Sequence, residues 1–150
     1  MDSRKVLIGL AAGLLAANAF GADRSAEEKH NLDLVMNFWN NVFMKRDTTR
    51  VGEFFADNYV DHNPNVTAPG IPGLVDYLKY LATRPAPTES DVVVATVDGE
   101  IVTLIRKRTL PDPKDPGKTY EAFGFDAMRV HGGKIVEHWD AATLPSGAPK

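Results

Sequence analysis

Hydrophobic and polar positions divide the chain into a part with helical spacing and a later part with strand spacing. Ser25 and Glu28 have the separation of a capping box, which marks the start of a helix. Behind them, apolar side chains recur every three or four positions, at Leu32, Val35, Met36, Trp39, Val42 and Phe43. Such a stripe is typical of an amphipathic helix. We therefore predict a long first helix that ends near Lys45.

Two shorter helices are expected between residues 47 and 84. Asp47-Thr48-Thr49 offers N-cap candidates for a helix that runs through Phe54 and Phe55. Residues 58–62 look extended, and the following Asn63-Pro64-Asn65 indicates a turn. The segment Gly70-Ile71-Pro72-Gly73 leads into a third helix, which a proline-rich stretch after Arg84 ends.

From Ser90 onward the period changes to two and β-branched residues dominate. Four strands are predicted, over residues 91–97, 100–108, 119–130 and 134–143. Asp98-Gly99 and Gly132-Gly133 are signals of two-residue hairpin turns. Helices followed by an antiparallel meander predict an α+β domain. We expect a curved, mainly antiparallel sheet wrapped round the long N-terminal helix, with two shorter helices and a cavity between the layers.

The first 21 residues have the layout of a secretory signal peptide. Arg4 and Lys5 precede an uncharged apolar run, and small residues suited to cleavage follow at Ala17-Asn18-Ala19 and Ala19-Phe20-Gly21. A retained membrane anchor is the alternative, although the uncharged stretch is short for spanning. We expect a periplasmic or secreted protein that has no membrane contact after cleavage and consists of one domain, residues 22–150.

Composition narrows the classes of function. The chain has 150 residues, a net charge of −3 and no cysteine. A weakly acidic chain lacks the basic field that nucleic-acid binding needs, so no nucleic-acid partner is expected. The absence of cysteine excludes disulfides, thiolate metal sites and cysteine nucleophiles.

Candidate chemistry concentrates in two segments. In Tyr59-Val60-Asp61-His62-Asn63, strand alternation places Tyr59, Asp61 and Asn63 on one side and His62 on the other. In the segment from Lys134 to Asp140, His138 and Asp140 share one face, and Glu137 and Trp139 the opposite face. A carboxylate beside an imidazole in an apolar cavity is suited to general acid–base chemistry, because burial and neighbouring charges tune both pKa values.

The register of the last hairpin leaves the cavity-facing side open. With Gly132 and Gly133 as the turn, Asp126 pairs with Trp139, on the face opposite His138 and Asp140. Asp126 and Asp140 then line one cavity only if a β-bulge intervenes or the edge of the sheet curls over.

These motifs resemble the SnoaL-like polyketide cyclase family, within the nuclear-transport-factor-2-like superfamily. The resemblance covers roughly residues 26–143 and includes Tyr59-Val60-Asp61-His62-Asn63-Pro64, Phe125-Asp126-x-x-Arg129 and the segment from Gly133 to Asp140. It implies a cone-shaped α+β barrel with an apolar pocket, and often a homodimer formed through the sheet. It also implies aldol-type ring closure in which a carboxylate removes a proton next to a carbonyl, with no metal or organic cofactor.

The resemblance suggests which residues form the site. Asp140 is the candidate base, and His62, Asp126 and His138 are its candidate catalytic partners. Candidate ligand-binding residues are Tyr59, Asn63, Trp39, Phe125 and Trp139. A metal site built from His62, His138 and a carboxylate is not expected, since the spacing does not support it.

Three classes of function remain open. The first is a cofactor-free acid–base enzyme of the lyase or isomerase type, acting on a small carbonyl compound by condensation, isomerisation or dehydration. The second is an exported protein that binds a small apolar molecule without chemistry. The third is an interaction module that dimerises through its sheet. Fold alone does not choose among them.

Overall fold

A computed structural model describes residues 23–84 and 90–143, and the predicted signal peptide lies outside these residues. Helix α1 spans Ala26–Phe38 and begins with the predicted capping box: the Ser25 hydroxyl accepts from the Glu28 amide, and the Glu28 carboxylate accepts from the Ser25 amide. One turn of π-helix, η1 (Trp39–Phe43), continues it. Such turns often occur at functional sites, and here Trp39 and Phe43 stack with ring centroids 4.3 Å apart.

The second helix is shorter than predicted. Helix α2 covers only Val51–Phe54, and its N-cap is Arg50, which makes no side-chain capping bond. The expected cap residue, Asp47, instead accepts hydrogen bonds from the amide and hydroxyl of Thr49. This local turn satisfies the Asp47 carboxylate outside the helix. Helix α3 spans Gly70–Ala82, as the sequence predicts.

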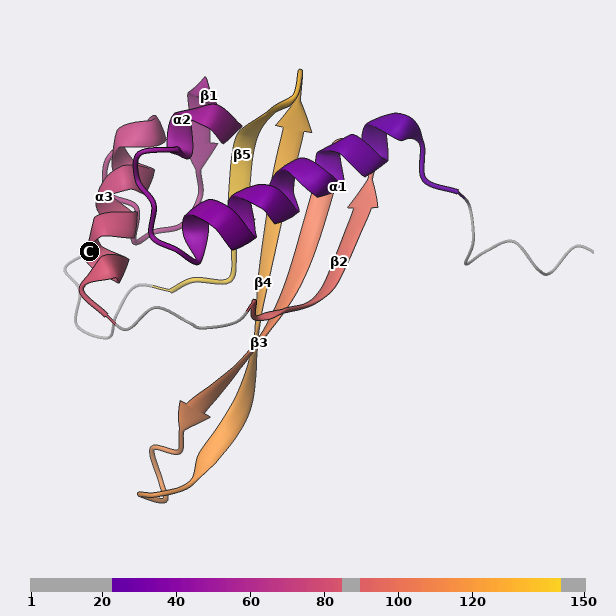
Figure 1. The fold of residues 1–150 in the computed structure, drawn as a ribbon. Helices are drawn as coiled ribbons and strands as arrows, with labels where there is room; N and C mark the ends of the chain where they lie inside the picture. The colour runs from indigo at the N-terminus through magenta and orange to yellow at the C-terminus, as the bar shows by residue number, and fades with distance from the viewer. Residues whose placement is uncertain (1–22, 85–89, 144–150) are drawn as a thin grey trace, which may run out of the picture.

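Five strands form one curled sheet in the order β1-β5-β4-β3-β2 (Figure 1). They are β1 (Phe55–Asp61), β2 (Val92–Asp98), β3 (Ile101–Pro111), β4 (Thr119–His131) and β5 (Lys134–Asp140). Strand β1 pairs in parallel with β5, and all other neighbours are antiparallel. The fold therefore has the expected mainly antiparallel, curved sheet with a long N-terminal helix and two shorter ones, and the parallel β1–β5 pair makes the sheet mixed.

The two hairpin turns differ from each other. Gly132 and Gly133 form the predicted turn between β4 and β5, with φ angles of 58° and 73° that suit glycine. In the first hairpin Asp98 still pairs with Ile101, so the turn consists of Gly99 and Glu100 rather than of Asp98 and Gly99. The strand thus extends one residue further than the turn signal suggests.

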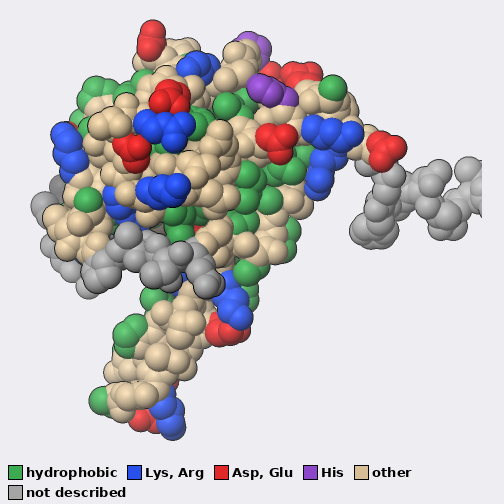
Figure 2. Space-filling view, in the orientation of Figure 1, with side chains coloured by type: hydrophobic (Ala, Val, Ile, Leu, Met, Phe, Trp, Pro, Cys, Tyr) green, Lys and Arg blue, Asp and Glu red, His purple; other side chains and the backbone are tan. Residues whose placement is uncertain are grey.

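Helix α1 lies across one face of the sheet, and α2 and α3 cover the end near β1 (Figure 1). Buried apolar side chains of α1 and η1 pack against those of the sheet to form the core: Val35, Phe38, Val42, Val102, Leu104, Met128, Val130 and Ile135. Burial of each stabilises the fold by roughly 1.5–3 kcal/mol. The far halves of β3 and β4 continue beyond this core as a two-stranded arm (Figures 1 and 2).

Among the described residues, no helix is both long and apolar enough to cross a membrane.

Candidate functional site

A pocket of about 280 Å³ lies between η1, α3 and the inner face of the sheet. Most of its wall is aromatic or aliphatic, and the apolar residues that line it include Phe38, Trp39, Phe43, Phe55, Leu74 and Met128. Its polar residues include Asp61, Asn63, Arg106, Asp126, His138 and Asp140. A mostly apolar cavity with a few converging polar groups is typical of a small-molecule site.

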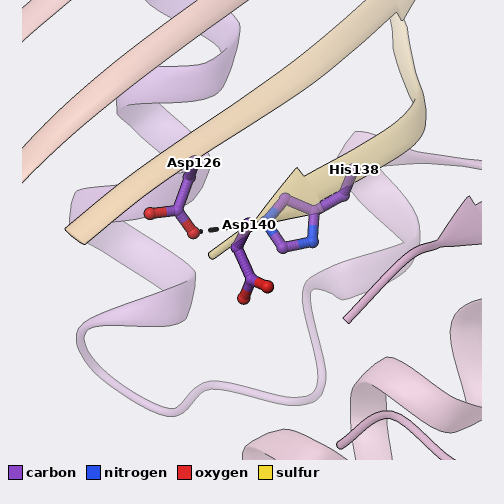
Figure 3. A group of neighbouring side chains, drawn as sticks. All are labelled: Asp126, His138 and Asp140. Atoms are coloured by element: carbon purple, nitrogen blue, oxygen red, sulfur yellow. Dashed lines mark hydrogen bonds and ion pairs between the residues drawn. The ribbon is translucent and has the colours of Figure 1, made fainter. Parts of the chain in front are cut away.

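A β-bulge in β5 brings the key acidic residues to one face. Pairing shifts between Arg129 and Val130, with Val136 as the extra residue on β5. Asp126 therefore lies opposite Asp140, and not opposite Trp139. This is one of the two arrangements that the sequence left open, and it places Asp126, His138 and Asp140 together (Figure 3).

His138 bridges two carboxylates. Its Nδ1 lies 3.0 Å from Oδ1 of Asp61 on β1, and its Nε2 lies 3.2 Å from Oδ1 of Asp126 on β4. Burial opposes protonation of His138, but hydrogen bonds and charge attraction from Asp126 and Asp61 outweigh it and raise the pKa to about 9. At neutral pH the ring is an imidazolium that donates through both nitrogens.

Asp61 is held as a carboxylate by three donors. Besides His138, the Tyr59 hydroxyl donates to Oδ2 over 2.6 Å and the Asn63 amide to Oδ1 over 2.9 Å. Burial works against ionisation of Asp61, but these bonds outweigh it and lower the pKa. Burial and the neighbouring Asp61 charge raise the pKa of Tyr59, which therefore keeps its proton.

Asp126 is paired with a second cation. Nε of Arg106, on β3, donates to Oδ2 of Asp126, and the Arg106 guanidinium lies over the Trp39 ring, 4.9 Å from its centroid. Arg106 reaches Asp126 by crossing its cross-strand partner, Gly124. A Cβ at Gly124 would lie 3.1 Å from the guanidinium, so glycine makes room for this path. Asp91 completes the group, 3.7 Å from Arg106 and bound by the Trp39 indole N–H.

Asp140 accepts hydrogen bonds only from neutral donors. The Asn63 side-chain amide donates to Oδ2 over 2.7 Å, and the Ala142 backbone amide donates to Oδ1 over 2.9 Å. No Lys, Arg or His among the described residues forms an ion pair with Asp140. Asp140 therefore differs from Asp61 and Asp126, each of which is paired with a cation.

Most predicted site residues do line the pocket. Asp126, His138 and Asp140 lie there, as do Trp39, Tyr59 and Asn63, and half-exposed Phe125 lies at the edge. His62 and Trp139 do not. They lie on the outer face of the sheet, where their rings stack with centroids 5.4 Å apart and His62 pairs with Glu137 over 2.8 Å.

Strand alternation explains why His62 and Trp139 lie outside the pocket, contrary to their expected place in it. Asp61 and Asn63 face inward, so His62 between them faces out. After the bulge, His138 and Asp140 face inward, and Trp139 between them also faces out. Because His62 faces outward and His138 faces the pocket, these two side chains do not face a common metal site.

The polar groups of the pocket that sequence reasoning missed include Asp61, Arg106 and Tyr77, together with Arg46, Asp91 and Arg108. Asp61 shares the inward face of Tyr59 and Asn63, so alternation had already marked it. Arg106 continues the inward series of Val102 and Leu104 on β3, a signal that an interrupted apolar pattern could have given. Tyr77 is on the pocket side of α3 and carries no separate signal.

Ligand atoms of Asp126, His138 and Asp140 lie within 4.8 Å of one another, which a metal ion could bridge. Both nitrogens of His138 already donate to carboxylates, and Asp126 is already paired with the Arg106 cation. A metal would have to take the place of the His138 proton beside that cation. The arrangement therefore suits proton chemistry better than metal binding.

Replacement of His62 by Ala is expected to leave pocket function unchanged. The side chain is nearly half exposed and its ion pair with Glu137 is on the surface, where such pairs contribute about 0–1 kcal/mol. We expect a change in unfolding free energy below about 1 kcal/mol, measured by urea denaturation. A loss of ligand binding in this variant would contradict the outward placement of His62.

Comparisons with known proteins agree with this architecture. A protein described as a SnoaL-like polyketide cyclase from Jannaschia sp. CCS1 matches with 18% identity and a TM-score of 0.62, over 81% of this chain and 92% of that one. An LEH-like epoxide hydrolase of M. tuberculosis matches with 20% identity and a TM-score of 0.57, over 76% of this chain and 83% of that one.

A protein described as a polyketide cyclase from Acidithiobacillus ferrooxidans matches with 19% identity and a TM-score of 0.58, over 74% of this chain and 86% of that one. At these identities the likenesses show the fold, and with it the expected cone-shaped, NTF2-like architecture. No curated protein matches the sequence. The family model of the SnoaL-like domain matches residues 35–138. Because this match covers well over half of the chain, the protein belongs to the family of SnoaL-like domains.

Proposed function

We propose that this protein is a cofactor-free acid–base enzyme that acts on a small carbonyl compound held in the pocket. One observation carries the proposal: Asp140 is a pocket carboxylate with no cationic partner among the described residues. It lies next to the paired charges of Asp61, His138, Asp126 and Arg106, which we call the pocket floor. Asp61 and Asp126 already have cationic partners, His138 and Arg106, whereas both hydrogen-bond donors to Asp140 are neutral. Asp140 is therefore the base.

The proposed step is removal of a proton from the carbon next to the carbonyl. The C–H bond breaks, Asp140 takes the proton, and the electron pair moves to the carbonyl oxygen to give an enolate. The His138 imidazolium and the Arg106 guanidinium supply a fixed positive field close by. Charges that are already oriented in a water-poor site are effective stabilisers of such an oxyanion.

Tyr77 is the candidate hydrogen-bond donor to that oxygen. It lines the pocket from α3. Burial, and to a smaller degree the charge of Asp140, raises the pKa of its hydroxyl. The phenol therefore remains protonated at neutral pH and is available to donate. Condensation, isomerisation and dehydration all begin from this enolate, so the proposal covers the three.

A second candidate is ligand binding without turnover. It is favoured by the hydrogen bonds of the pocket floor, because Asp61, Asp126 and His138 are all hydrogen-bonded to protein groups. Such a network orders a pocket whether or not a reaction follows.

Exchange of α-protons in D2O separates the two candidates. The probe is 4-oxo-4-phenylbutanoate, an aromatic ketone, and ¹H NMR follows loss of the signal from the CH2 next to the ketone. Exchange well above the buffer rate is expected of the enzyme. Binding with exchange at the buffer rate would favour the second candidate.

We also propose export and dimerisation. The basic and apolar start of the chain supports a periplasmic or secreted location. Exposed apolar side chains on the sheet, such as Val60 and Phe123, support a homodimer that covers them. Mass spectrometry of the protein from expressing cells tests for cleavage after residue 21, and light scattering of the purified protein tests for two copies.

A further inference from the structure

Two arginines line the pocket without a carboxylate partner. Asp61 and Asp126 are each paired with a cation, and Arg106 is shared between Asp126 and Asp91. Arg46 and Arg108 also line the pocket, yet neither forms an ion pair with any acidic residue in the described part of the chain. Pocket cations that remain uncommitted are suited to an anionic ligand.

Arg46 is held in an unusual environment. Its Nε is buried and has no hydrogen-bond partner among residues 23–84 and 90–143, while one terminal nitrogen donates to the Phe43 carbonyl over 2.6 Å. A buried N–H without an acceptor is costly. Burial lowers the pKa of Arg46, although Tyr77 and Asp91 work in the opposite direction. The protein itself therefore leaves this cation incompletely satisfied.

The backbone at Arg46 adds a second observation. Arg46 follows the end of η1 and has φ of 58°, a left-handed conformation. Helices commonly end on such a residue, and glycine is the residue favoured there. Arginine at this position carries a conformational cost, while its side chain contributes a guanidinium 5.0 Å from the Phe43 ring centroid at the pocket wall.

Arg108 lies on β3 two residues beyond Arg106, so both side chains are on the pocket face. The intervening Lys107 faces away and pairs with Glu121. Tyr77 lines the same pocket as Arg106, Arg108 and Asp140. Arg46 after η1, Arg108 on β3 and the proposed base Asp140 on β5 therefore line one cavity from three different elements.

We infer that the ligand of this pocket is a carbonyl compound that also carries a carboxylate, and that Arg46 and Arg108 bind this carboxylate. The inference rests on the proposed function for the carbonyl and on the two arginines for the anion. The carboxylate supplies the acceptors that Arg46 lacks, and it orients the carbon next to the ketone toward Asp140.

The test compares 4-oxo-4-phenylbutanoate with 4-oxo-4-phenylbutanamide, which has the same shape without the charge. Isothermal titration calorimetry is expected to show that the acid binds at least tenfold more tightly than the amide, since charge-assisted bonds are the stronger ones. Arg46→Gly and Arg108→Met are each expected to reduce this preference severalfold, and together to abolish it. Glycine favours the left-handed backbone conformation of residue 46, so we expect the Arg46→Gly variant to fold.

Lys107→Met and Lys45→Met serve as controls. They remove the same charge from neighbouring positions that do not line the pocket, and the acid preference should persist. Equal or undetectable binding of acid and amide to the wild type would overturn the inference. A preference that survives in the double arginine variant would overturn it too.

The same samples keep the two proposals apart. If the acid is preferred but neither compound exchanges its α-protons in D2O, the proposed enzyme function fails while the anion site stands. If both compounds exchange and bind equally, the function stands and the anion site fails.

Discussion

Replacement of Asp140 by Asn is expected to lower the rate of α-proton exchange by about 10²- to 10⁴-fold, the usual contribution of a positioned general base. The amide keeps the size of the side chain, and its single oxygen can still accept one of the two hydrogen bonds that Asn63 and Ala142 now donate to separate oxygens of Asp140. It has no basic oxygen, however, so proton removal is lost while binding of the probe is retained. The measurement is the initial exchange rate by ¹H NMR at saturating probe.

Asp76→Asn is the matched control, because it makes the same chemical change at an exposed position on α3 paired with Lys79. Its exchange rate should equal that of the wild type. Asp126→Asn gives a further distinction. If this variant, and not Asp140→Asn, loses exchange while remaining folded, then Asp126 is the base and the assignment of Asp140 is wrong.

The second large effect concerns stability and pH. The pKa of His138 is about 9 in the folded protein, against 6.5 for an ordinary histidine. The folded form therefore retains a proton that the unfolded chain loses. The corresponding stability is complete below about pH 6.5 and declines as the pH rises through about 9. Since one pH unit corresponds to about 1.4 kcal/mol, the free energy of unfolding is expected to fall by about 3 kcal/mol across this window.

Urea denaturation at several pH values between 6 and 10 measures this decline. The control is His131→Gln. The pKa of His131 is also raised, by a hydrogen bond and charge attraction from Glu100, but on the surface. That variant should keep most of the decline, and His138→Gln should remove it. Should His138→Gln fail to fold, direct NMR titration of the wild-type imidazole decides, and a pKa near 6.5 would refute the bridged imidazolium.

The order of the helices and strands was predictable because most of them have a strong local signal. The capping box at Ser25 and the apolar stripe behind it define α1, and two positive-φ glycines define the β4–β5 turn. Local signals also placed Tyr59 and Asn63 on one face of an extended strand.

The composition of the site was less predictable, for a geometric reason. A single extra residue at Val136 reverses the facing of every later residue of β5 relative to its partner strand. Nothing in the local sequence fixes such a bulge, since it depends on how β5 fits between β1 and β4. The same limit applies to Arg106, whose role arises only when Asp126 and Trp39, distant in sequence, meet its guanidinium.

The chain of charges from Asp61 through His138 and Asp126 to Arg106 crosses four strands of the sheet, from β1 through β5 and β4 to β3. These hydrogen-bonded charges connect the parallel edge strand β1 to the antiparallel strands β5, β4 and β3, so the pocket floor also stabilises the sheet. Removal of one member leaves another charge buried without its partner, which typically costs about 3–5 kcal/mol. Natural divergence or laboratory selection for a new substrate should therefore vary the aromatic walls and the arginines at the rim, and leave the floor intact.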